Sequence, residues 1–287
     1  MPTPLFILGT HRGGTTLLQR VCNSCDDVVI WGEHAGFLRQ IAEAFFAGME
    51  NPHLFQDVRV DATSDPATDW QAWMNGFSRE DWVRDYRTFI ERLLVPSQRA
   101  VAVWGFKEIR YGVSPPDRTI ELLAALFPAA HFAFIVRNPY NMIASARRRP
   151  GGPSNLADLR RVCDNWVARL HTFRRWHQSG KLRSVWVAYE ELIEGCGEVV
   201  TLLERLGHTF GPAQRSVITA ESGRGSSFKG GDVHSRWQDL PRTWRALTRD
   251  RLGTLAGELG YPPPPLAVGW RQLAPLLGRL GAAERAK

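Results

Sequence analysis

The segment from Pro4 to Arg20, PLFILGTHRGGTTLLQR, places the strongest constraint on the fold of this chain. An apolar strand runs into a glycine-rich turn, and that turn opens directly into a helix. Gly9, Gly13 and Gly14 allow the backbone to turn tightly with few side chains in the way. The unpaired N–H groups at a helix N-terminus favour an anion. The segment therefore predicts a phosphate- or sulfate-binding loop at the carboxyl end of the first strand.

The same loop argues against an ordinary nucleoside-triphosphate hydrolase. Its glycine spacing matches a P-loop, but Thr15 stands where the Walker lysine is expected. The nearest positive charge is Arg12, whose planar guanidinium suits a pair of phosphate or sulfate oxygens better than a metal. Thr15 and Thr16 add hydroxyls at the start of the helix. A plain strand-to-helix connection would show the same glycines, so the interpretation needs a second motif.

The stretch HFAFIVRNPYNMIASARRR supplies that second motif, because it repeats the arrangement of strand, charged residue and helix. A buried strand is expected over Phe132–Val136, with Arg137 at its carboxyl end. Asn138 is a good N-cap and Pro139 a good first helical residue. Ligands of open α/β sheets bind outside the carboxyl ends of the strands, so Arg137 and Arg12 should share one rim. Two anion sites on one rim imply a ligand with two phosphate-like ends.

These motifs resemble those of the sulfotransferases that use 3′-phosphoadenosine 5′-phosphosulfate (PAPS). In that family the first loop reads Arg or Lys, Ser, Gly, Thr, Thr and holds the 5′-phosphosulfate; residues 12–16 here read Arg, Gly, Gly, Thr, Thr. Gly13 replaces the usual serine, which removes a hydroxyl from the sulfate side of the loop. The family's 3′-phosphate motif is an arginine at a strand end followed eight positions later by a helix serine, as Arg137 and Ser145 are.

The resemblance implies an α/β fold with a P-loop-type central parallel sheet flanked by helices. It also implies PAPS as the donor, adenosine 3′,5′-bisphosphate (PAP) as the product and no metal. Two weaker matches extend it. VWVAYEEL resembles a later core strand whose tyrosine lies near the nucleotide, which assigns that role to Tyr189. SSFKGGDVHSRW resembles a loop that closes over the 3′-phosphate, with Lys229 as its basic residue, although a glycine-rich surface loop would look much the same.

For the chemistry, the bacterial and Golgi or tyrosylprotein branches offer the closer resemblance. Glu33 follows Arg12 by twenty-one positions, and in the tyrosylprotein branch a glutamate at that spacing is the general base. Sulfuryl transfer to a hydroxyl needs such a base, because the attacking oxygen must lose its proton. His34 is the alternative base, since the cytosolic branch uses a histidine, but there the histidine comes later in the chain. A surface carboxylate after the second strand is the plainer interpretation of Glu33.

VAVWGFKEIRY resembles a Trp-Gly-x-Lys-x-Pro segment in which the lysine contacts the bridging oxygen or the sulfate. Lys107 takes that position, while Glu108 and Ile109 depart from the usual residues. Only four of the 36 basic residues are lysine, and two of the four, Lys107 and Lys229, fall at expected ligand positions. The compact ammonium group of lysine can follow the negative charge as it shifts during sulfuryl transfer. A lysine at a strand end with its head in water remains the alternative.

At 287 residues and 44% hydrophobic composition, the chain is long enough for one wound α/β domain over residues 1–287. Residues 37–97 are expected to form a mainly helical, acceptor-side insertion. Their aromatics recur at helical spacing, which predicts a packed face with Trp82, Tyr86 and Phe89. Two more helices are expected, over Asn155–His177 and over Ser235–Leu259, and the globular part should end before a basic tail at 262–287.

The net charge and the cysteine pattern restrict the ligands and partners expected for this chain. A formal charge of +7 and a pI near 9.6 suit an anionic donor, and no nucleic-acid-binding motif accompanies them, so no nucleic-acid partner is expected. Cys22 and Cys25 form the one C-x-x-C, too few for a zinc site; we expect them to pack around the first helix. The N-terminus leads straight into a core strand without a signal peptide or membrane anchor, which favours a cytoplasmic protein. The arginine- and alanine-rich composition favours a bacterial one.

Two other functions stay open at this point: a P-loop phosphotransferase of small-molecule kinase type, and a nucleotide- or polyanion-binding protein without catalysis. The acceptor of a sulfotransferase would be a small molecule, a glycan or a peptide, because acceptor pockets diverge on a shared fold. The sequence also leaves a homodimer open.

Overall fold

The computed structural model describes residues 2–55, 77–97, 100–113, 117–147, 151–223 and 237–264. The chain divides into two compact units. The first comprises Met1–Arg137 and Asp164–Lys229, and the second comprises Asn138–Cys163 and Gly230–Lys287. The sheet and most of the helices belong to the first unit.

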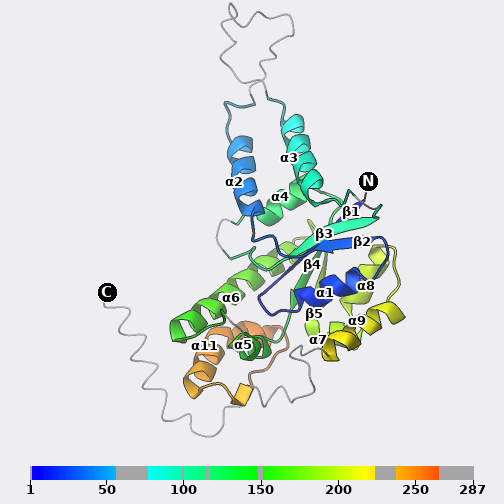
Figure 1. The fold of residues 1–287 in the computed structure, drawn as a ribbon. Coiled ribbons are helices and arrows are strands. Elements are labelled where there is room, and N and C mark those ends of the chain that lie inside the picture. Colours follow the sequence, from blue (N-terminus) through cyan, green and yellow to red (C-terminus); the bar gives the residue numbers. More distant parts are fainter. Residues whose placement is uncertain are drawn as a thin grey trace, which may run out of the picture. The chain divides into compact units, whose positions relative to one another are not determined.

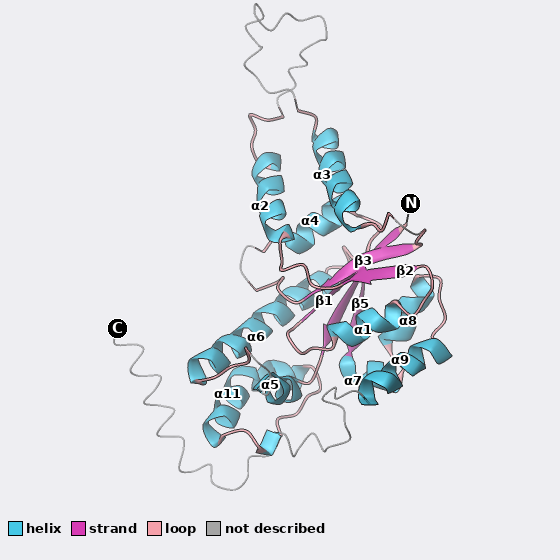
Figure 2. Ribbon diagram, in the orientation of Figure 1, coloured by secondary structure: helices cyan, strands magenta, loops and turns pink. Residues whose placement is uncertain are grey.

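Five strands form one sheet in the first unit (Figures 1 and 2). They are β1 (Thr3–Gly9), β2 (Val28–Trp31), β3 (Val103–Glu108), β4 (His131–Val136) and β5 (Arg183–Ala188). The order is β2-β3-β1-β4-β5, and every neighbouring pair is parallel. The predicted α/β fold with a central parallel sheet is confirmed. The expected adjacency of the first strand and the Phe132–Val136 strand also holds, since β1 pairs directly with β4.

The described helices follow or lie between these strands along the chain. They are α1 (Thr15–Cys22), α2 (Leu38–Met49), α3 (Arg79–Leu94), α4 (Thr119–Leu126), α5 (Pro139–Arg147), α6 (Leu156–Gln178), α7 (Tyr189–Glu194), α8 (Glu198–Arg205), α9 (Pro212–Gly223) and α11 (Arg242–Glu258). Among the described helices, none combines the length and the hydrophobicity needed to cross a bilayer.

The two faces of the sheet bury different kinds of side chain. Alternation along the strands directs aliphatic residues such as Ile7 and Ile135 to the face that α1, α8 and α9 cover. Cys22 and Cys25 are unbridged and lie in this aliphatic core, as expected. The other face is aromatic: the ring of Phe6 packs against Trp104, Phe106, Phe127 and Phe132. Both faces are therefore closed to water, as a parallel sheet requires.

Helices α2 and α3 lie side by side and pack through aromatic residues (Figure 1). A side chain at Gly48 of α2 would come within 2.3 Å of the Trp82 ring of α3, so the helices approach closely there. Trp82 donates from Nε1 to the carbonyl of Phe45 (3.3 Å), and the Tyr86 ring lies 5.2 Å from the Phe45 ring. The prediction for Phe89 is wrong, because its side chain is 48% exposed. The buried face instead continues in steps of four residues to Ile90 and Leu94.

The second unit contains α5, the start of α6, and α11. Asn138 caps α5 as predicted, with its Oδ1 accepting from the backbone N–H of Tyr140 (3.0 Å). The Tyr140 ring packs against Trp237 (5.2 Å), and the Arg147 guanidinium lies 5.0 Å from the Trp244 ring. Helix α6 begins and ends one residue later than expected from periodicity, and α11 begins seven residues later and ends one residue earlier.

Candidate active site

The loops that follow β1 and β4 meet at one rim of the sheet. Arg137 follows the last residue of β4 and is buried, and its Nη1 donates to the backbone carbonyl of Arg12 (3.3 Å), which lies in the loop after β1. The two residues are 125 positions apart in the chain. Their contact follows from the parallel pairing of β1 and β4, which brings the carboxyl ends of both strands to the same edge.

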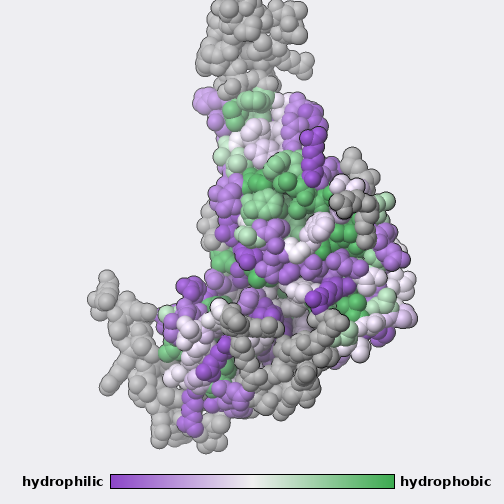
Figure 3. Space-filling model, viewed as in Figure 1, coloured by the Kyte–Doolittle hydropathy of each residue, from purple (hydrophilic) through white to green (hydrophobic). Residues whose placement is uncertain are grey.

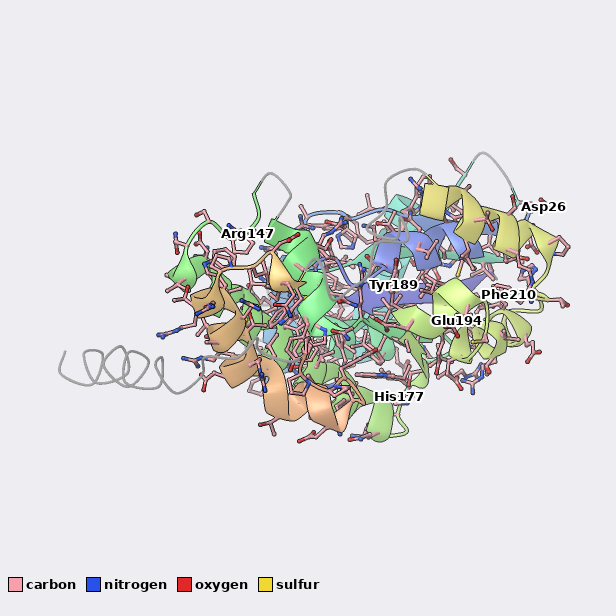
Figure 4. All side chains as sticks on the ribbon, turned by 90° about the horizontal axis from the view of Figure 1, so that it is seen from below. Asp26, Arg147, His177, Tyr189, Glu194 and Phe210 are labelled. Atoms are coloured by element: carbon pink, nitrogen blue, oxygen red, sulfur yellow. The ribbon has the colours of Figure 1, made fainter. Side chains whose placement is uncertain are left out.

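Tyr189 joins this rim from the end of β5. It is the first residue of α7 and is buried, and the Arg137 guanidinium lies 4.3 Å from the centre of its ring. A side chain at Gly14 would come within 2.2 Å of the Tyr189 ring, so that ring sits directly on the first loop. Figure 4 shows Tyr189 beside the blue first segment of the chain. The ends of three adjacent strands, β1, β4 and β5, therefore converge.

The loop before α1 has the backbone of an anion site. Gly13 donates its N–H to the carbonyl of Thr10 (2.9 Å), and a side chain at Gly13 would lie 2.8 Å from the Thr10 hydroxyl. Arg12 (φ 62°) and Gly14 (φ 97°) are both in the left-handed region, which is strained for arginine. Helix α1 has no side-chain N-cap and no acidic residue in its first turn. Its first amides therefore suit a phosphate or sulfate group.

The remaining donor-side residues are less fully placed. Thr15 is buried and Thr16 is exposed in the first turn of α1. Ser145 is buried within α5 of the second unit. Lys229 lies outside the described residues.

A second group of charged residues lies where β2 and β3 end. Glu33, two residues after β2, accepts from Lys107 Nζ at 2.5 Å and from Arg110 Nη1 at 2.9 Å. Partial burial acts to raise the pKa of the Glu33 carboxyl, but the hydrogen bonds and charges of Lys107 and Arg110 outweigh it and hold the pKa below its ordinary value. Lys107 is buried, so it is not a strand-end lysine with its head in water.

Glu108, the last residue of β3, organises this group. Its carboxylate is buried, pairs with Arg110 Nη1 (2.8 Å), and accepts the backbone N–H groups of Gly36 (2.9 Å) and His34 (3.3 Å). It thus fixes the loop that carries Glu33, in which Ala35 adopts a strained φ of 60°. We name these residues the Glu33 cluster: Glu33, Lys107, Glu108 and Arg110.

His34 lies among aromatic rings. Its ring packs against Phe37 (4.8 Å) and Phe106 (4.5 Å), and the Tyr111 hydroxyl lies 3.4 Å from it. Burial lowers the pKa of His34, while the charge of Glu108 acts in the opposite direction. The imidazole is therefore neutral at pH 7 and packed on one side.

The sequence alone assigned no role to three ionisable groups near Glu33. Arg110 lies in the VAVWGFKEIRY segment, and its contacts with Glu33 span 77 positions of the chain. His11 lies in the first loop, where burial and the charge of Arg12 lower its pKa, and the charges of Glu33 and Arg169 also act on it. Arg169 of α6 donates from Nε to the carbonyl of Tyr111 (3.2 Å). Of these three residues, only Arg110 could have been identified from the sequence, because it comes just after an apolar strand.

A groove of about 480 Å³ runs between α2 and α3, within the segment expected to be on the acceptor side. Its lining surface is mainly apolar and comes from Gln40, Ile41, Ala44, Asp85, Tyr86 and Phe89. The space-filling view shows apolar surface gathered around these helices, with polar side chains on the outer side of α3 (Figure 3). Within the described part of the chain, no group of three or more metal-ligating side chains is present.

A parallel sheet that presents arginines at adjacent strand ends, next to a glycine-rich loop and a paired carboxylate, suits an anionic ligand. The family model for the sulfotransferase family matches residues 4–211, and the chain belongs to that family. It is accordingly a sulfotransferase.

Solved structures show the same fold. The sulfotransferase domain from the Synechococcus PCC 7002 olefin synthase is 20% identical, with a TM-score of 0.54 over 92% of this chain and 96% of that one. The sulfotransferase domain from the curacin biosynthetic pathway is 19% identical, with a TM-score of 0.52 over 92% and 99%. The comparison with curated proteins found no significant match.

Proposed function

We propose that this sulfotransferase takes its sulfuryl group from PAPS and transfers it, by in-line displacement, to a hydroxyl of a small-molecule, glycan or peptide acceptor. One observation carries the choice of donor: Arg12, Arg137 and Tyr189 come together where three adjacent strands end. PAPS has negative groups at its 3′ and 5′ positions with an adenosine between them. This rim offers the Arg137 guanidinium, the Tyr189 ring, and the charge of Arg12, which acts on Tyr189.

The first loop would hold the 5′-phosphosulfate. Arg12 supplies charge, and the amides of Gly13 and Gly14 with the hydroxyls of Thr15 and Thr16 supply donors at the uncapped start of α1. The absence of a side-chain cap supports this fit, because the helix dipole there has no acidic residue of its own to face.

The 3′-phosphate would bind Arg137, with Ser145 as a second donor, following the resemblance of these two positions to the family's motif. Tyr189 would lie against the adenosine side of the donor, because its ring already packs against Arg137. Lys229 remains assigned to a loop that closes over the nucleotide.

Glu33 is the proposed general base, and Lys107 is the proposed partner of the sulfate. Glu33 is ionised at neutral pH, because its pKa is lowered, so it can accept the proton of the attacking hydroxyl. The ammonium group of Lys107 forms an ion pair with Glu33 in this structure. When Lys107 turns toward the sulfate, Glu33 keeps only Arg110 as a partner, so its pKa rises and it becomes a stronger base.

The rest of the catalytic effect would come from alignment and fixed positive charge. By analogy with phosphoryl transfer, the transition state spreads charge over the transferred group's oxygens, which Arg12 and Lys107 would face. The groove between α2 and α3 is the proposed apolar wall of the acceptor site.

Calorimetry with PAP tests this proposal and separates it from a P-loop kinase. We expect PAP to bind without magnesium. Tighter binding of ATP that requires magnesium would contradict the proposal, because a P-loop kinase holds its nucleotide through the metal.

A further inference from the structure

Arg169 stands out among the cations around Glu33, because the others already have acceptors. Lys107 pairs with Glu33, and Arg110 pairs with both Glu33 and Glu108. Arg39 donates from Nη2 to the carbonyl of Arg110 (2.7 Å) and lies 3.8 Å from Asp117. These side chains are therefore committed to the protein's own oxygens.

Arg169 uses only one edge of its guanidinium. Its Nε donates to the carbonyl of Tyr111 (3.2 Å), which fixes the direction of the side chain. Among the described residues, no acceptor takes a hydrogen bond from its Nη1 or Nη2, and no carboxylate lies within ion-pair distance. Two parallel donors of a fixed fork are thus left for an oxyanion.

The surroundings of Arg169 leave it a cation that can still meet a ligand. Burial and, after it, the charge of Arg39 lower the pKa of Arg169 to about 10, so the guanidinium remains charged at pH 7. The Nε of Arg39 is also buried without an acceptor. This corner of the site therefore has more donors than acceptors.

The position of Arg169 places it on the acceptor side. The charges that act on it come from Arg39, Asp117, Glu108 and Arg110. Glu108 and Arg110 belong to the Glu33 cluster, and Arg39 donates to the carbonyl of Arg110. Arg169 and Glu33 also both act on His11, so the two groups lie around one common side chain.

We propose that the Nη groups of Arg169 bind an oxyanion of the acceptor, so that the natural acceptor carries a carboxylate or a phosphate in addition to the hydroxyl that receives the sulfuryl group. This subsite rests on the proposed function, because it orients a hydroxyl toward Glu33. It also restricts the acceptor class to anionic hydroxyl compounds.

The test incubates the protein with ³⁵S-labelled PAPS and the small-molecule and peptide fractions of an extract of its host, and identifies the labelled product by mass spectrometry. We expect a product with a carboxylate or phosphate besides the new sulfate, and its mass distinguishes the two. With that acceptor, Arg169→Met should raise KM about tenfold or more, as loss of a charge-assisted pair does, with the dissociation constant for PAP unchanged.

Two variants control the experiment. Arg169→Lys keeps the charge but loses the fork, so we expect an intermediate KM. Arg175→Met removes an exposed arginine from the last turn of the same helix and should leave KM as in the wild type. A labelled product without a second anionic group, or an unchanged KM in Arg169→Met, would overturn the subsite while leaving the sulfotransferase intact. Failure of the wild type to bind PAP would remove the proposed function and this subsite with it.

Discussion

The rim formed by Arg12, Gly14, Arg137 and Tyr189 and the Glu33 cluster lie at ends of the same sheet, but they are held together differently. On the rim, the contacts described join a side chain to backbone or to a ring, as Arg137 does with the carbonyl of Arg12 and with Tyr189. In the Glu33 cluster, carboxylates and cations pair with one another. In the proposed function the rim receives an external anion without losing an internal ion pair, whereas the Glu33 cluster exchanges an internal partner before Glu33 acts as the base.

Removing the base should have the largest effect and would break the comparison most directly. In Glu33→Gln we expect turnover to fall by about 10²–10⁴, the usual contribution of a general base. PAP binding should persist, because the rim does not use Glu33. Single-turnover kinetics measures the loss of turnover, and calorimetry with PAP measures the retained binding. Full turnover would show that the base is wrong, and would return His34 to consideration.

Removing the buried guanidinium of the rim should weaken PAP binding. Arg137→Ala should raise the dissociation constant for PAP about tenfold or more, as expected for losing a charge-assisted hydrogen bond. Tyr189→Phe is the matched control, since it keeps the ring beneath Arg137 and removes only the hydroxyl. If PAP bound equally well to Arg137→Ala, the 3′-phosphate assignment would fail.

The buried carboxylate of the cluster should give a smaller effect. Glu108→Gln keeps the shape but removes the charge that pairs with Arg110 and accepts two loop amides. We expect kcat to fall by about tenfold, on the order of one weakened charge-assisted contact, with PAP affinity unchanged. Retention of wild-type kcat would mean that the loop holds Glu33 without this residue.

The smallest effect concerns pH. Arg110 helps to lower the pKa of Glu33, so Arg110→Met should raise that pKa while Lys107 still holds it down in part. A base with a higher pKa loses activity earlier as pH falls, so the acid limb of kcat/KM should move to higher pH, by about one unit or less. If the acid limb stayed in place or moved to lower pH, the group that titrates in kcat/KM would not be Glu33.

The rim could be predicted from sequence because each of its parts follows a strand directly. Apolar runs ending in Gly9 and Val136 identify parallel core strands, and parallel strands end at one edge, so Arg12 and Arg137 had to meet. The class of fold followed from the resemblance of these two motifs to those of the sulfotransferases.

The Glu33 cluster could be predicted only residue by residue. Glu33 and Lys107 were each identified, but their ion pair joins positions 74 apart and depends on β2 lying next to β3, which no local pattern states. Arg169 reaches Tyr111 across 58 positions, from a helix that was predicted without a role for any of its arginines. Periodicity gives the face of a helix, but it does not show which long polar side chain turns back into a site.

The start of α1 has neither a side-chain cap nor an acidic first turn, so donor binding at the proposed first-loop site should depend on the anions in the buffer. Inorganic sulfate and phosphate carry the charge that this helix end favours, so they would compete with the donor for the first loop. Apparent donor affinities measured in phosphate buffer or after ammonium sulfate precipitation would then understate the true value, and salt-matched chloride solutions would be the proper reference.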